Sequence, residues 1–544
     1  MLRYLRWIAE NSRGVRGALV MTFIPGLLSV AVSLVFIWIC KHLVDIASGG
    51  AQASELLVPS IVMCLLQLSR ICLNALAARY DSISYARLNF NIRARLFSSL
   101  LQSQWEGKEK MHSGDALNRL FTDVDTVTKV ICRDIPSAAV TLVRLLAALV
   151  FLAVLDLRLA LVILLVTPAL LLAGKLFFRK IRQMTKDIRQ TESSVQTHIQ
   201  ESIQNKTLLQ SMEMGPVAEN DLSDLQSREF GQIMRRTRFN IWSKVILGLS
   251  FAAGYAIAFL WGVHGIAAGT VTFGMMTAFL QLVGQIQHPA MSLSQQIPSF
   301  IYASASIDRL MELSGALREE EGEPIRLNPP AGLRITDVSF KYPDGEKNVF
   351  SSFSHDFKPG SRTAIVGRTG VGKSTLIRLM LSLLRPSGGS LCLYDSETPP
   401  GSEVPCSPRT RVNFSYVPQG NSLFSGTVRD NLLIGNPSAS EDDMRKALER
   451  AAAEFVFELP DSLDTVCGEK GSGLSEGQAQ RIAIARGLLR PGSILLMDEF
   501  SSSLDAETEE RLIKNLVADA SDKTMIFITH RERITDFCDT VVRL

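Results

Sequence analysis

The sequence predicts a chain of two unlike halves, an α-helical membrane domain followed by an α/β domain with a phosphate-binding loop. Apolar runs long enough to cross a membrane crowd the region before about residue 300. Strand, turn and charge patterns fill the remainder, which holds the glycine-rich segment 367–375 and an apolar run at 494–497 that ends in two carboxylates. The average composition, 47% hydrophobic and 20% charged over 544 residues, conceals this division.

Six segments of the first half are predicted to be transmembrane helices, because about 20 apolar residues cross roughly 30 Å of hydrocarbon. The alternative, a set of buried helices in a large soluble core, is disfavoured by so many runs of this length. The first run is also too long for a signal peptide and lacks a small-residue cleavage site. The six segments are residues 18–40, 56–78, 136–155, 159–178, 245–263 and 271–291.

Basic residues predict how this half is oriented in the membrane. The N-terminal segment 2–16 and the long connections 79–134 and 179–244 are rich in Arg and Lys, whereas the short connections near 156–158 and 264–265 are nearly uncharged. Lys and Arg accumulate in cytoplasmic loops. We therefore expect both termini and the α/β domain to lie in the cytoplasm, at a cell membrane of bacterial type.

The segment GRTGVGKST at 367–375 fits the phosphate-binding pattern G-x-x-x-x-G-K-[ST]. The glycines of this pattern let backbone N–H groups turn inward around phosphates. The alternative is a glycine-rich loop that merely turns before a helix. We expect Lys373 to reach the outer phosphates and the Ser374 hydroxyl to ligate Mg²⁺. The other expected nucleotide contacts of the loop are Gly367, Thr369, Gly370, Gly372 and Thr375.

The run ILLMDE at 494–499 reads as a buried parallel strand whose end carries Asp498 and Glu499. α/β sheets present their functional groups at this end of a strand. Asp498 is expected to hold Mg²⁺, through water, and Glu499 to polarise the attacking water. An acidic strand end or helix cap without catalytic function is the alternative.

Together with the segment LSEGQ at 474–478, these motifs make the chain from about Leu333 onward resemble the nucleotide-binding domain of ABC transporters. The resemblance implies a P-loop NTPase domain of ABC type that binds ATP and Mg²⁺. It implies that Tyr342 stacks on adenine, that Gln419 reaches Mg²⁺ and the attacking water, and that His530 contacts the γ-phosphate. It further implies that the signature contacts the ATP of a partner subunit through Ser475, Gly477 and Gln478.

Two further positions match the family pattern, and two features of the sequence depart from it. Glu469 matches the acidic residue of an exporter-specific loop, and 501–505 matches the loop that crosses between the two sites of a dimer. Glu476 stands where the family most often has glycine, but Ser475 and Gly477 are retained, so we expect an active site. The sequence ends at Leu544, about where the family adds further C-terminal structure, which puts any contact through such a tail in doubt.

The first half resembles the six-helix membrane domain of ABC exporters, whose helices extend far into the cytoplasm. The resemblance places short coupling helices near 110–115 and 207–216. The predicted domains are therefore a transmembrane domain at 1–314, a linker at 315–332 and the ATPase domain at 333–544.

The predicted function is that of a half-size ABC exporter that dimerises and uses ATP hydrolysis to export or flip an amphipathic lipid, peptide or drug-like molecule. A homodimer is expected, and a heterodimer with a second half-transporter stays open. The alternatives are an importer-like use of the same fold and an ATP-gated channel or regulator. Cysteine spacing indicates neither a zinc site nor a disulfide framework, and a net charge of +3 gives no case for nucleic acid.

Polar residues within the spans are the candidates for the cargo site. The last span carries a polar stripe at helical spacing that includes Gln281, Gln285 and His288, and such a stripe is costly against lipid. Arg70 and Arg144 lie in the second and third spans, where charge indicates function. Hydrogen bonding between helices at the dimer seam is the alternative for the stripe, and snorkelling to lipid phosphates is the alternative for the arginines. If the arginines face the cavity, the cargo has an anionic or hydrogen-bonding part.

Overall fold

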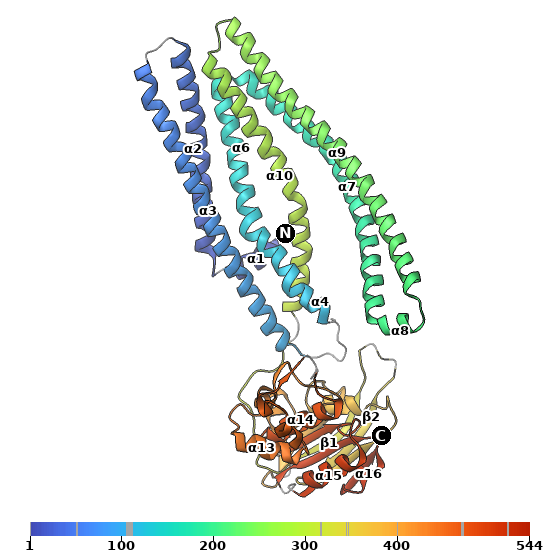
Figure 1. The fold of residues 1–544 in the computed structure, drawn as a ribbon. Coiled ribbons are helices and arrows are strands. Elements are labelled where there is room, and N and C mark those ends of the chain that lie inside the picture. The colour runs from blue at the N-terminus through green and yellow to red at the C-terminus, as the bar shows by residue number, and fades with distance from the viewer. Residues whose placement is uncertain are drawn as a thin grey trace. The chain divides into compact units, whose positions relative to one another are not determined.

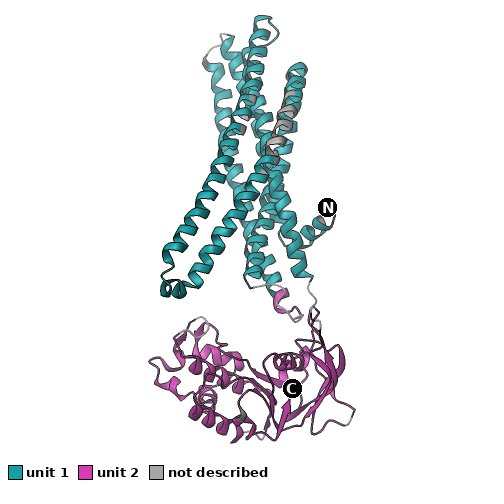
Figure 2. Cartoon of the chain, turned by 90° about the vertical axis from the view of Figure 1, so that its right-hand side faces the viewer, with its two compact units in different colours: residues 1–98, 113–315 teal, residues 99–112, 316–544 magenta. Residues whose placement is uncertain are grey.

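The computed structural model describes residues 2–12, 14–49, 53–104, 113–315, 318–343, 345, 347–399, 401–468, 473–518 and 522–544. The chain divides into two compact units, residues 1–98 with 113–315, and residues 99–112 with 316–544 (Figure 2). The predicted linker therefore falls almost entirely within the second unit, together with residues 99–112 from the middle of the first long connection.

The first unit is entirely helical in its described part (Figure 1). From α4 to α6 the helix is interrupted only by two π-helical turns, η1 and η2. The elements are α1 (Leu2–Asn11), α2 (Arg16–Ser48), α3 (Ala53–Leu101), α4 (Ser113–Asn118), η1 (Arg119–Asp123), α5 (Val124–Lys129), η2 (Val130–Asp134), α6 (Ile135–Leu155), α7 (Leu157–Gln204), α8 (Lys206–Ser211), α9 (Gly215–Ala267) and α10 (Phe273–Ser314).

Each of the six predicted spans falls within a different long helix, namely α2, α3, α6, α7, α9 and α10. Four helical stretches of the described residues are long and apolar enough to cross a membrane: Arg16–Ser48, Ser54–Leu101, Gly114–Leu155 and Gly215–Ala267. The count of six spans stays a prediction. The second predicted coupling helix falls on α8, whereas residues 110–112 of the first lie outside the described residues.

Helices α7 and α9 run side by side and are joined through α8 (Figure 1). The apolar core of the unit lies where α2, α6, α7, α9 and α10 meet, and Phe279 and Leu282 of α10 are fully buried in it. Asp156 fixes the turn between α6 and α7, because its carboxylate accepts hydrogen bonds from the Leu159 backbone at 3.0 Å and from Trp261 Nε1 at 2.8 Å. A capping carboxylate of this kind satisfies backbone donors that a helix start leaves unpaired.

The second unit contains two main sheets. An antiparallel sheet has the strand order β2-β1-β4-β5, and a parallel sheet has the order β11-β3-β10-β9-β6. The antiparallel strands are β1 (Ala331–Phe340), β2 (Phe350–Phe357), β4 (Gly388–Asp395) and β5 (Val404–Pro405). The parallel strands are β3 (Arg362–Val366), β6 (Phe414–Val417), β9 (Ile494–Asp498), β10 (Thr524–Thr529) and β11 (Thr540–Arg543), and a small separate pair joins β7 (Gly426–Thr427) to β8 (Val466–Cys467).

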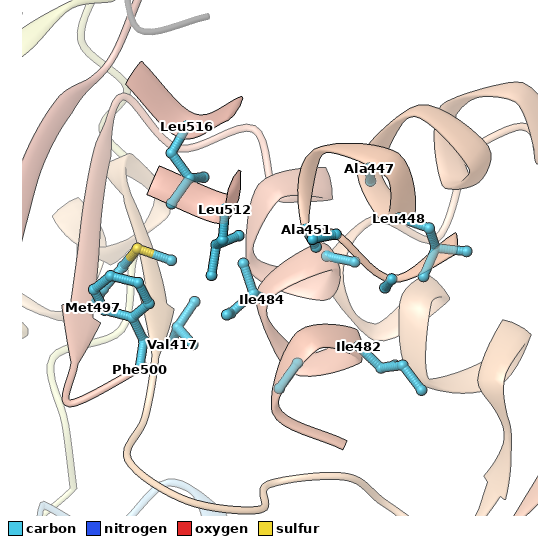
Figure 3. Packing of buried hydrophobic residues seen from close by; sticks show 14 of the residues in the cluster. Val417, Ala447, Leu448, Ala451, Ile482, Ile484, Met497, Phe500, Leu512 and Leu516 are labelled. Carbon is cyan, nitrogen blue, oxygen red and sulfur yellow. The ribbon is translucent and has the colours of Figure 1, made fainter. Parts of the chain in front are cut away.

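Helices complete this unit and bury the apolar strands. They are α11 (Lys373–Met380), α12 (Val428–Gly435), α13 (Glu441–Arg450), α14 (Glu476–Leu489), α15 (Ala506–Ala518), α16 (Glu532–Thr535) and the 3₁₀ turns η3 (Pro408–Asn413), η4 (Glu454–Glu458) and η5 (Ser462–Asp464). In Figure 3, Ile484 of α14 and Leu512 of α15 lie beside Val417 and Phe500. Every residue of β9 is buried, as the apolar run at 494–497 predicts.

Candidate nucleotide site

The predicted catalytic residues meet at one edge of the parallel sheet. The phosphate loop follows β3, Glu499 follows β9, His530 follows β10, and Gln419 comes two residues after β6. The strands pair in register up to their carboxyl ends, with Val366 opposite Thr529 and Asp498 opposite Ile528. Parallel strands end at a common edge, where ligands of open α/β sheets bind. The topology therefore brings together four segments that are far apart in the sequence.

Two glycines give the phosphate loop its shape. Gly370 has φ +86° and Gly372 has φ +112°, values in the left-handed region that favours glycine. A Cβ at position 372 would also lie 2.5 Å from Val349 Cγ1. Gly372 directly precedes α11, so the loop opens onto the N-terminus of that helix, which favours anions. Thr369 and Ser374 are exposed in this loop, and Thr375 is buried.

Lys373 links the phosphate loop to the catalytic side chains. Its ammonium, on a side chain that is 7% exposed, donates to the Gly367 carbonyl at 2.8 Å and lies 2.7 Å from His530 Nε2. The same His530 nitrogen lies 2.8 Å from Glu499 Oε1. A single ring nitrogen either accepts from Lys373 or donates to Glu499, depending on the tautomer. In either tautomer His530 connects the loop lysine to the predicted general base.

Glu499 is held in a strained backbone conformation. Its φ is +43°, which costs a non-glycine residue about 1–3 kcal/mol and persists only where the surroundings enforce it. Its backbone N–H donates to the Ile528 carbonyl at 2.9 Å, and its carboxylate accepts from Gln419 Nε2 at 2.6 Å. The backbone and the side chain of Glu499 are thus both fixed, with Oε1 beside His530 and Oε2 beside Gln419.

Asp498 is the buried acid of the site, 5% exposed. Burial, and after it the nearby charge of Glu499, raise the pKa of Asp498 to about 6, although Lys373 and Arg378 partly oppose this shift. Among the described residues, no group of three or more His, Cys, Asp or Glu side chains is placed to hold a metal ion. The Asp498 carboxylate and the Ser374 hydroxyl are nevertheless groups that suit Mg²⁺, which is commonly bound by one or two carboxylates together with substrate phosphates.

We expect Mg²⁺-dependent nucleotide binding to weaken about tenfold between pH 7.5 and pH 5, because a pKa of about 6 leaves roughly a tenth of Asp498 ionised at pH 5. Protonation removes the negative charge that the metal needs. The measurement is the affinity for a fluorescent ATP analogue with Mg²⁺ and with EDTA at each pH. The variant Asp498→Asn is the control, because any pH dependence that it retains belongs to the nucleotide. An equal pH dependence in both proteins contradicts the prediction.

Tyr342 lies against the phosphate-loop helix. Its hydroxyl is 3.0 Å from Thr375 Oγ1 and 3.4 Å from Arg378, and its ring meets Phe340 edge-on with the centroids 4.9 Å apart. The predicted adenine platform is therefore beside the loop, while its stacking role stays a prediction. Arg378 is a neighbour that the sequence analysis missed. Its place on α11, five residues after Lys373, was the signal that could have identified it.

The signature residues are organised by the start of α14. Ser475 is the N-cap: its hydroxyl accepts from the Gln478 backbone at 3.2 Å, and Gln478 Oε1 accepts from the Ser475 backbone at 2.9 Å. A Cβ on Gly477 would lie 2.8 Å from the Ser503 carbonyl oxygen. Glycine at 477 therefore has a packing reason that the sequence analysis missed, a close approach to the loop at 501–505. Glu469 lies outside the described residues.

The polar candidates of the last span have partners on two different helices. Gln281 hydrogen-bonds with Cys40 of α2, and Gln285 Oε1 accepts from Ser33 of α2 at 3.4 Å. His288 stacks on Phe251 of α9 with the ring centroids 5.5 Å apart. The side chains of the stripe thus make contacts between helices of one chain, whereas a role in the cavity wall and hydrogen bonding at the dimer seam both stay predictions.

Comparison with known proteins identifies both halves. Residues 19–290 match the family model of the ABC transporter transmembrane region, and residues 350–502 match that of the ABC transporter. The chain is 25% identical to "Putative multidrug export ATP-binding/permease protein YgaD" of Bacillus subtilis, over 100% of this chain and 94% of that protein. It is 27% identical to antigen peptide transporter 2 of Rattus norvegicus, over 98% and 77%.

The fold has a similar solved structure, a bacterial Atm1-family ABC exporter with ATP bound, at a TM-score of 0.82 and 23% identity over 97% of this chain and 94% of that one. A helical membrane domain and an α/β nucleotide-binding domain are fused in one chain, which is the arrangement of a half-transporter. The protein belongs to the ABC transporters. It has the exporter fold, as the motifs predict, and it is an ATP-hydrolysing transport protein of the membrane.

Proposed function

We propose that this protein is the subunit of a dimer that binds two ATP molecules with Mg²⁺ and uses their hydrolysis to move an amphipathic molecule out of the cytoplasm by alternating access. The observation that carries the proposal is the convergence of the phosphate loop, Glu499, His530 and Gln419 at one sheet edge. Similarity to proteins that are named as export ATP-binding/permease proteins supports the outward direction.

The chemistry that we assign to this edge is phosphoryl transfer to water. Backbone N–H groups of the loop and Lys373 neutralise the developing charge on the phosphates, and Glu499 orients and polarises the attacking water. Mg²⁺, when bound, would add further positive charge beside the phosphates. Ser374 and Asp498 would hold Mg²⁺, and Gln419 stands beside both the metal position and the base. His530, between Lys373 and Glu499, contacts the γ-phosphate.

The positions of the signature and the phosphate loop within one chain support a dimer. Ser475 and Gly477 lie at the start of α14, which packs with α12 and α13, whereas the phosphate loop opens onto α11. We assign the signature residues to the ATP of the partner subunit, so that each site is completed by two chains. A homodimer suffices, because every predicted catalytic position in the described sequence carries a suitable residue.

We expect Lys373→Ala to weaken ATP binding by roughly ten- to a hundredfold, since a buried ammonium that reaches the phosphates makes charge-assisted hydrogen bonds of about 1.5–3 kcal/mol. The measurement is the affinity for a fluorescent ATP analogue. The matched control is Lys514→Ala, which removes an exposed lysine that pairs with Glu510 on α15. Unchanged affinity in Lys373→Ala contradicts the proposed nucleotide site.

Transport itself is tested in vesicles that contain the purified protein with its ATPase domain outside. ATP added outside should drive labelled amphipathic lipids, peptides or dyes into the lumen, and the Glu499→Gln protein should not. Movement of the label out of the lumen indicates import, and an ATP-dependent ion conductance indicates a channel. Either result overturns the proposed export.

A further inference from the structure

The predicted membrane spans carry positive charge without any negative charge. They contain Arg70, Arg144 and Lys175, and no Asp or Glu occurs in any of the six segments. A second copy of the chain adds further cations and no acid. An unpaired guanidinium inside a membrane is costly and indicates function. The predicted spans of neither subunit therefore supply a counter-charge for these arginines.

Two of these cations lie close to each other. Arg70 of α3 and Arg144 of α6 both lie beside one part of α2. Asn74, one turn after Arg70, accepts a hydrogen bond from Ser29, and a Cβ on Gly26 would lie 2.8 Å from Val140, one turn before Arg144. Each lies eight residues from the end of its predicted span on the side of the long connections. At a rise of 1.5 Å per residue this is a depth of about 12 Å for both. Two like charges at one depth repel each other, and an anion between them removes the repulsion.

The surroundings of Arg144 disfavour simple snorkelling. Its Nε atom is buried within the protein and has no hydrogen-bond partner among the described residues. A buried polar nitrogen without a partner costs free energy that a bound acceptor restores. Asn74 lies four residues after Arg70, on the same face of α3. Its oxygen accepts from the buried Ser29 at 3.3 Å, so that its N–H groups are left to donate to a ligand.

We propose that Arg70 and Arg144 form a binding site for an oxyanion, the phosphate or carboxylate head of an amphipathic molecule. A guanidinium binds either group through two parallel N–H donors, which an ammonium cannot do. The apolar tail lies along the membrane-spanning helices, and lipophilic cations are repelled. The inference that this molecule is the cargo rests on the proposed function, whereas the site itself does not.

The binding test uses the delipidated protein in an uncharged maltoside detergent without nucleotide. Radiolabelled dodecyl phosphate and dodecanoate should bind, and dodecyltrimethylammonium should not. Arg70→Gln and Arg144→Gln should each weaken the anion about ten- to a hundredfold, as the loss of a charged hydrogen bond predicts. Arg70→Lys and Arg144→Lys keep the charge and serve as controls for misfolding. Each should lose less anion affinity than the corresponding Gln variant.

Lys175→Gln is the control for loss of membrane charge, because it removes the remaining cation of the predicted spans, on a different span from either arginine, and should leave anion affinity unchanged. Any of three results overturns the site. Lys175→Gln loses as much anion affinity as the arginine variants, dodecyltrimethylammonium binds as well as the anions, or Arg70→Gln and Arg144→Gln both keep the anion affinity of the wild type. No nucleotide is present, so this failure is separable from that of the proposed function. If the protein transports amphipathic molecules into vesicles but does not bind the anion, only the oxyanion inference is contradicted. If it binds the anion but shows no ATP-driven transport, only the proposed function is contradicted.

Two further measurements distinguish the sources of the anion. If dodecyl phosphate stimulates the ATPase of the wild type and not of Arg144→Gln, the oxyanion belongs to cargo. If stimulation is absent and native mass spectrometry finds a phospholipid that wild type retains and Arg144→Gln loses, the oxyanion belongs to a resident lipid. Both outcomes support the arginine pair as the site.

Discussion

Glu499→Gln should still bind ATP but hydrolyse it about 10²- to 10⁴-fold more slowly, the usual loss for a positioned base. The amide keeps the size of the carboxylate and its place beside Gln419 and His530, yet it cannot polarise water. Steady-state phosphate release measures the rate, and a fluorescent ATP analogue measures binding. The strained backbone at φ +43° is unaffected by this change, so loss of rate without loss of affinity isolates the side chain.

Two variants serve as controls for this prediction. Glu507→Gln makes the same change at an exposed position in the first turn of α15 and should leave the rate unchanged. Gln419→Ala removes the neighbour that holds Glu499 Oε2 at 2.6 Å and should lower the rate by a smaller factor. Hydrolysis by Glu499→Gln at the rate of the wild type contradicts the assignment of the general base.

The shape of the phosphate loop could be predicted from the sequence because its parts are local. The loop needs a preceding strand, two left-handed glycines and a helix start. The structure has β3 at 362–366, and the glycines and the helix start follow within 367–375. Glu499, His530 and Gln419 could be expected together, because each follows an apolar strand and parallel strands end at one edge. The hydrogen-bond partners within this group depend on the strand order, which no local pattern contains.

Other features depend on which elements are neighbours in space. The close approach of Gly477 to the Ser503 carbonyl joins two loops that no periodicity connects. In the last span, helical spacing predicted a polar face, but it could not predict that the partners of Gln285 and His288 lie on α2 and α9, at distant positions in the sequence. The arginine pair likewise required the helices α3 and α6 to be placed beside one part of α2.

Composite sites make a cis–trans experiment decisive. In a dimer with Glu499→Gln in one subunit and Ser475→Arg in the other, both changes fall on the same ATP site, so the second site stays intact. With both changes in one subunit and a wild-type partner, each ATP site carries one change. We therefore expect the trans dimer, with the two changes in different subunits, to retain hydrolysis at about half of the wild-type rate if the two sites act independently. The cis dimer, with both changes in one subunit, should lose hydrolysis by about 10²-fold or more.

Differently tagged copies and two successive affinity steps give the mixed dimers, and phosphate release measures their activity. The dimer of Glu499→Gln with wild type must first show that one intact site is active. Ser475→Arg also removes an N-cap, which costs about 1 kcal/mol of helix stability, so Ser475→Ala is the control for lost capping alone. Equal activity of cis and trans dimers would mean that the signature does not act on the partner's ATP. The separation of Ser475 at the start of α14 from the phosphate loop at α11 would then need another explanation.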